Sequence, residues 1–98
     1  MYKIIIPEYV LKDIYKIKDY IFKVSFSIEI SNKIYNEIMA HILNLKIMPK
    51  MYPVFKEDLR VMTVRKKYRV FYKIFEEKRE VIIYYIFGVE EDYESLIY

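Results

Sequence analysis

The sequence predicts an α+β fold in which an antiparallel helical hairpin packs on a mainly antiparallel four-stranded sheet. Two patterns predict it: apolar residues recur every three or four positions in the first half of the chain, whereas β-branched and aromatic runs alternate with short polar connections in the second half. A short strand precedes the helices, and a short helix or tail ends the chain. With 98 residues, we expect one domain spanning residues 1–98.

The composition narrows the class of protein. A hydrophobic fraction of 55% beside 32% charged residues is typical of a globular chain. Because cysteine is absent, disulfides, zinc fingers and thiol nucleophiles are excluded. No apolar run reaches the ~18 residues of a membrane span, and the apolar start is too short for a signal peptide. We therefore expect a soluble, cytoplasmic protein without a membrane partner.

The first half predicts a strand and two helices. Residues 2–6 are a short β-branched run that Pro7 ends. An amphipathic helix is predicted over residues 8–22, and residues 23–27 break its pattern. Ser27 is a suitable N-cap for a second helix, which Pro49 stops. The apolar stripes of the two helices are Val10, Ile14, Ile17 and Ile21, then Ile30, Ile34, Ile38, Ile42 and Leu45.

The second half predicts a linker and an antiparallel meander. Residues 50–58 contain a second proline and read as the linker. Strands are predicted at residues 59–64, 68–75 and 81–87, with turns at 65–67 and 76–80. The last strand lacks alternation, which favours a central position with both faces covered.

Charge is unevenly distributed along the chain. Residues 1–49 carry seven lysines against five acids, and residues 50–79 carry ten basic residues against four acids. Residues 80–98 carry five acids and no basic residue, so the balances of +2, +6 and −5 give the net charge of +3. A basic middle predicts a positive surface for an anionic partner, with an acidic tail nearby.

The order of these motifs resembles the RelE/ParE toxins of type II toxin–antitoxin systems. The first helix carries Asp13-Ile14, Ile17 and Tyr20-Ile21, and the second helix ends in Leu45 before Pro49. Tyr52-Pro53 supplies the family's Tyr-Pro pair, Arg60 opens a strand, and Tyr68-Arg69-Val70-Phe71-Tyr72 supplies its Tyr-Arg-x-x-Tyr. The resemblance covers residues 2–96. Members often have a basic run after the last strand, where this chain has Glu90-Glu91-Asp92.

The resemblance implies a growth-inhibiting toxin, of the kind linked to plasmid stabilisation, that a cognate antitoxin neutralises. Its target is either the ribosome, where messenger RNA is cut, or DNA gyrase, which is poisoned without chemistry. The alternative is a catalytically degenerate relative that binds nucleic acid or protein. No cofactor is implied in either case, and the oligomeric state stays open.

If the chain is a ribonuclease, the resemblance implies metal-independent attack by a ribose 2′-OH. That reaction needs a proton acceptor, positive charge on the phosphate and a proton donor. Arg69 matches the family's phosphate-stabilising arginine, Arg60 would act by charge, and Tyr93 would stack on a base or pass a proton. The alternative is that both arginines are solvated strand residues or pair with the acidic tail, while Tyr93 simply packs.

Three basic residues at the predicted turn are candidate phosphate contacts. Arg65, Lys66 and Lys67 would bind nucleic acid in a salt-dependent way, or would only keep the turn polar. His41, the single histidine, lies beside the apolar stripe of the second helix and is expected to pack or face solvent. No metal site is expected, because the chain has a single histidine and no cysteine, and Glu90, Glu91 and Asp92 alone are a weak signal.

Overall fold

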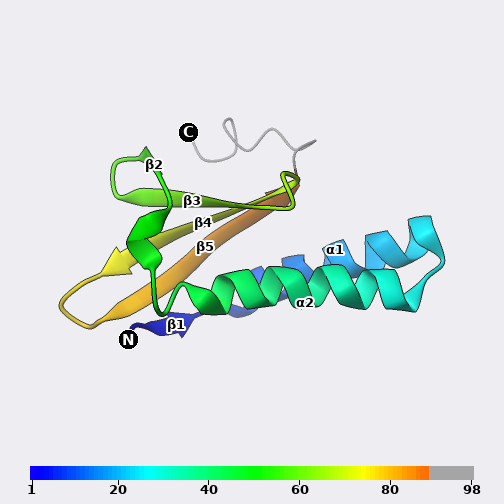
Figure 1. Ribbon diagram of the computed structural model, residues 1–98, viewed down its shortest axis with the longest axis horizontal. Coiled ribbons are helices and arrows are strands. Elements are labelled where there is room, and N and C mark those ends of the chain that lie inside the picture. The colour runs from blue at the N-terminus through cyan, green and yellow to red at the C-terminus, as the bar shows by residue number, and fades with distance from the viewer. Residues whose placement is uncertain (89–98) are drawn as a thin grey trace.

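The fold is a helical hairpin on one face of a five-stranded sheet (Figure 1). This computed structural model describes residues 1–88. The strand order is β1 (Lys3–Ile5), β5 (Glu80–Gly88), β4 (Tyr68–Phe75), β3 (Leu59–Val64) and β2 (Val54–Lys56). The strand β1 pairs with β5 in parallel, and the other neighbours are antiparallel. The predicted α+β class and the mainly antiparallel sheet are confirmed.

The predicted number of strands is wrong by one. The additional strand, β2, lies inside the segment 50–58 that we interpreted as a linker, and it pairs with the start of β3. It has three residues, which are too few for a period-two pattern to be recognised, and Pro53 precedes it. A short irregular edge strand is one way in which sheets avoid pairing with other chains.

The helices are close to their predicted positions. The first, α1 (Glu8–Ser25), is three residues longer than predicted. Ser25 is the last residue of the helix, and its hydroxyl donates to the Ile21 carbonyl at 2.7 Å. Phe26 then ends the helix in the left-handed conformation, with φ of 55°.

The second helix, α2 (Ile28–Asn44), begins after the predicted N-cap. The Ser27 hydroxyl accepts a hydrogen bond from the Ile30 amide at 3.1 Å. The helix ends before Pro49, which instead starts the short 3₁₀ helix η1 (Pro49–Met51). The η1 helix carries the chain from the hairpin back to the sheet (Figure 1).

The hydrophobic core lies between the hairpin and the sheet. Its fully buried members include Val10 and Ile14 of α1, Ile38 and Ile42 of α2, and Met62 of β3. The predicted stripe on the second helix does not stay buried along its whole length. Ile30 is 47% exposed, because the tip of the hairpin extends beyond the sheet (Figure 1).

The interior strand β5 contains a bulge. It lies between β1 and β4, as predicted from its apolar sequence. Phe71 pairs with Tyr85, but Tyr72 pairs with Ile83, so Tyr84 is an extra residue. The bulge reverses the alternation and lets both Ile83 and Ile86 face the core, which explains the missing period-two pattern. Tyr85, on the other face, is only half-buried, so the prediction that both faces are covered is only partly met.

Candidate functional site on the outer face of the sheet

The two arginines that the sequence placed in one site lie on opposite faces of the sheet. Arg60 pairs with Tyr72, a core residue, so its side chain leaves β3 on the face that the helices cover. Arg69 pairs with Thr63, an odd number of positions away, and therefore leaves β4 on the other face, here called the outer face. The structure thus does not bring the two guanidinium groups together.

Arg60 holds the segment that joins the hairpin to the sheet. Its Nη1 donates to the Tyr52 carbonyl at 2.7 Å and to the Lys50 carbonyl at 3.3 Å. Beside it, the buried Tyr72 hydroxyl donates to the Pro49 carbonyl. Burial raises the pKa of Tyr72 to about 12, while the nearby Arg60 charge acts in the opposite direction. The two side chains together bond three backbone carbonyls of this segment, those of Pro49, Lys50 and Tyr52.

Arg69 has a different environment on the outer face. It lies between Thr63 of β3 and Phe87 of β5 and is half-buried. Its Nη1 is shielded from solvent and has no hydrogen-bond partner in the structure. A buried cationic nitrogen without an acceptor is costly, so the site favours an anion.

Aromatic rings lie on the same face of the sheet as Arg69. Phe71 is fully buried there, and its ring meets Phe55, Tyr85 and Phe87 edge-to-face at centroid distances of 5.1, 6.4 and 6.0 Å. Tyr85 and Phe87 stack on each other at 5.8 Å. These four rings form a second, smaller apolar layer that lowers the local dielectric and strengthens charge interactions at Arg69.

Lys73 is the other basic residue of β4 on the outer face. Its ammonium lies 3.2 Å from the Asp58 carboxylate, and hydrogen bonding to that carboxylate raises the pKa of Lys73. Its charge is therefore already paired, in contrast to that of Arg69.

The three basic residues of turn 65–67 have different environments. Arg65 forms an ion pair with Glu37 and so fastens the turn to α2. Lys66 and Lys67 are exposed, and the Lys67 ammonium lies 5.9 Å from the centre of the Tyr68 ring. Arg65 and Lys66 both have φ of 56°, a conformation that costs non-glycine residues about 1 to 2 kcal/mol each.

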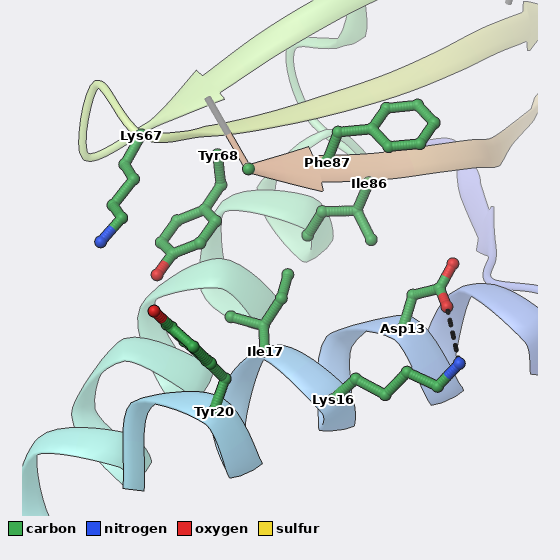
Figure 2. A pocket seen from close by; sticks show the side chains of 9 residues that line it. Asp13, Lys16, Ile17, Tyr20, Lys67, Tyr68, Ile86 and Phe87 are labelled. Atoms are coloured by element: carbon green, nitrogen blue, oxygen red, sulfur yellow. Dashed lines mark ion pairs between the residues drawn. The ribbon is translucent and has the colours of Figure 1, made fainter. Parts of the chain in front are cut away.

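A groove of about 550 Å³ lies between this turn and α1 (Figure 2). Tyr20 of α1 and Tyr68 of β4 point toward each other across it, with Ile17 and Ile86 beside them. At its rim, Asp13 and Lys16 form an ion pair of 3.9 Å. The volume suits a binding groove with apolar walls and a few polar groups.

The sequence did not single out Tyr20 as a groove residue. It occurred only within the Tyr20-Ile21 motif of the first helix, and twelve tyrosines in one chain hide any single functional one. Its 64% exposure, which only the packing of α1 on the sheet reveals, distinguishes it from the tyrosines of the core.

The remaining candidates add no further catalytic group. Tyr93 lies outside the described residues. His41 is half-buried on α2, where its Nδ1 lies 2.8 Å from the Glu37 carbonyl oxygen. Within residues 1–88, no three His, Cys, Asp or Glu side chains gather as a metal site would require. No helix in that part of the chain is long and apolar enough to cross a membrane.

Solved structures share this architecture. The chain superimposes on a chain of the chromosomal ParDE toxin–antitoxin system of P. aeruginosa with a TM-score of 0.76 at 17% identity, covering 91% of this chain and 97% of that chain. It superimposes on the isolated E. coli RelE toxin with a TM-score of 0.63 at 16% identity, covering 99% and 96%. The fold is therefore that of the RelE and ParE toxins.

Sequence comparison then identifies the family. The family model described as the ParE toxin of the type II toxin–antitoxin system parDE matches residues 4–93. The chain belongs to this family, which confirms the resemblance found in its motifs. A search of curated proteins finds no significant match.

Proposed function

We propose that this chain is the toxin of a type II toxin–antitoxin pair and that it arrests growth by binding DNA gyrase through the outer face, without catalysing a reaction. The separation of Arg60 from Arg69 carries this proposal. Arg60 is engaged by backbone carbonyls on the helix-covered face, so it cannot act on a phosphate that Arg69 holds. The family match to ParE toxins supports the same target.

The outer face is suited to binding. Arg69 supplies a guanidinium that fits two anionic oxygens, and the rings of Phe55 and Phe71 supply a firm apolar support. Among residues 1–88, β4 and β5 place no histidine there to act as a general base. Binding is therefore better supported than proton transfer.

The groove beside α1 is the proposed docking site of the antitoxin. Its walls are Ile17, Ile86 and the two facing tyrosines, while Lys67 contributes a positive charge at one end. An antitoxin segment with an apolar side chain followed by an acid would complement this arrangement. Tyr20→Ser should weaken antitoxin binding by about tenfold, as loss of roughly 1.4 kcal/mol requires.

Growth arrest and gyrase supercoiling test the proposed target. Expression of the wild type should stop growth, and the purified chain should inhibit gyrase. Arg69→Ala should weaken that inhibition by about 10-fold to 100-fold, because a charged hydrogen bond contributes about 1.5 to 3 kcal/mol. Arg65→Ala is the matched control, since it removes an arginine four residues away that pairs with Glu37. Full toxicity of Arg69→Ala would contradict the proposal.

Ribosome-dependent cleavage of messenger RNA is the second candidate. The observation that favours it is the unpartnered Arg69 nitrogen, which also suits a scissile phosphate. Mapping of messenger RNA ends after induction distinguishes the two, because only a ribonuclease creates new ends. A harmless wild type with an identical Arg69→Ala variant would instead support a non-enzymatic binding module.

A further inference from the structure

The tip of the helical hairpin exposes large apolar side chains. Both helices continue beyond the sheet, so the sheet does not cover the residues around the connection between them (Figure 1). Within segment 22–30, five large apolar residues are between 42% and 85% exposed, and none of them belongs to the hydrophobic core. These residues, here called the tip patch, are Phe22, Val24, Phe26, Ile28 and Ile30.

Phe26 is the most exposed member of the tip patch. It is 85% exposed and ends α1 in the left-handed conformation, with φ of 55°. Glycine or asparagine is favoured at such a helix end, because a Cβ atom is crowded there. The chain therefore has a large aromatic ring where the backbone favours glycine and where the rest of the chain hardly covers it. A contact with another molecule accounts for this ring, whereas the fold of the single chain does not.

The area of the tip patch matches the needs of a small protein–protein interface. Large apolar side chains each present roughly 150 to 250 Å² when uncovered, so the exposed parts of the patch amount to about 500 Å². Single exposed apolar residues are ordinary, but a continuous patch of this size is typical of an interaction site. Two such patches would together bury roughly 1,000 Å², which is about the lower limit for a specific interface.

The charge at the tip favours a second copy of the chain over an anionic partner. Residues 18–30 carry two lysines and two acids, so their charges cancel. Two tips therefore do not repel each other, and no excess of positive charge attracts phosphates to them. The basic residues of turn 65–67 and Arg69 lie on the sheet instead.

We propose that two copies of this chain pair through their tip patches about a two-fold axis. In such a contact both copies use the same surface, so the apolar side chains of each tip are covered by those of the other. The dimer is independent of the proposed function, because the tip patch lines neither the groove beside α1 nor the outer face of the sheet.

Sedimentation equilibrium of the isolated full chain tests the dimer. The average mass should rise from 12.2 kDa toward twice that value between about 1 and 200 μM, since small interfaces are typical of weak complexes. Ile28→Ser should weaken the dimer by about tenfold or more. Leu43→Ser is the matched control, because Leu43 is another exposed aliphatic residue of α2, 46% exposed near the opposite end of the helix. It should leave the dimer unchanged.

Phe26→Gly separates loss of the contact from loss of folding. Glycine suits φ of 55°, so the urea midpoint of the diluted, monomeric variant should be equal to or above that of the wild type. The same variant should dimerise at least about tenfold more weakly, because the largest exposed ring is gone.

Three results would overturn the proposal. The first is a wild type that stays monomeric up to about 200 μM, including one that instead sediments with vesicles of phosphatidylcholine and phosphatidylglycerol. The second is a dimer that Leu43→Ser weakens as much as Ile28→Ser does. The third is a Phe26→Gly variant that dimerises like the wild type.

Discussion

The two faces of the sheet use the same residue types for different purposes. On the helix-covered face, Arg60 donates to carbonyls and Tyr72 is buried with its hydroxyl bonded to Pro49, so polar groups are satisfied and serve stability. On the outer face, Arg69 is half-buried and its Nη1 has no acceptor in the described structure. The residue type alone therefore does not show whether an arginine serves stability or recognition. Its hydrogen-bond partners in the folded chain do show it.

The two faces of the sheet should respond differently to mutation. Removal of a satisfied group should lower stability and leave recognition intact. Removal of an unsatisfied group should weaken recognition and leave stability nearly unchanged, because that group contributes little to the free energy of folding.

Phe71→Ala should have the largest effect on stability. The ring is fully buried within the aromatic layer of the outer face, so its removal should cost about 3 to 5 kcal/mol. Urea unfolding measures the change, and Thr63→Ala, an exposed neighbour on the same face, should stay within about 0.5 kcal/mol. A small cost for Phe71→Ala would show that the outer face has no core of its own.

Arg60→Ala should destabilise the fold, whereas Arg69→Ala should not. Loss of the charged donor to the Tyr52 and Lys50 carbonyls should cost about 2 to 3 kcal/mol in the free energy of unfolding. Arg69→Ala should change stability by less than about 1 kcal/mol. Thermal and urea unfolding of both variants measure this contrast, and equal losses would remove the distinction between the faces.

Tyr72→Phe should cost about 1 to 2 kcal/mol, because the buried Pro49 carbonyl loses its donor. It should also change the response to alkali. The Tyr72 pKa is raised to about 12, so its contribution is complete below the unfolded value near 10 and is lost as pH rises toward 12. Stability curves between pH 8 and 12 should therefore be flatter for the variant, and parallel curves would contradict this.

Lys66→Gly should stabilise the protein by about 1 kcal/mol, the smallest effect in this series, because φ of 56° suits glycine better than lysine. Lys67→Gly is the control, since Lys67 lies in the same turn without a positive φ. Unfolding measurements should show a gain only for Lys66→Gly. An equal gain for both would indicate an effect of charge rather than of backbone conformation.

Several elements were predictable because their signals are local. The Ser27 cap, the spacing of Val10 and Ile14, and the motif around Arg69 each depend on neighbours in sequence. The end of α1 was not, since Val24 and Ser25 are of types that favour a break in a helix, yet the helix continues through both. The strand β2 was missed because its three residues depend on pairing with β3.

The candidate site was less predictable than the fold. The Tyr-Arg-x-x-Tyr motif identified Arg69, but nothing local shows on which face a strand residue lies. That depends on the register between β3 and β4, which tertiary contacts fix. The predicted anion-binding roles of Arg69, Lys66 and Lys67 stay predictions. Arg60 instead bonds the backbone of the segment between the hairpin and the sheet.

The turn between β3 and β4 joins two strands whose register decides which side chains share a face of the sheet. In the observed register Val64 lies opposite Tyr68, so Arg60 and Arg69 fall on opposite sides. A register shifted by one residue, with Arg60 opposite Phe71, would turn both arginines to the same side, but it would also turn the core residues of one strand outward. The register that buries Met62 opposite Val70 is therefore the same register that keeps Arg60 and Arg69 apart, and bringing them together would expose one of these buried rows.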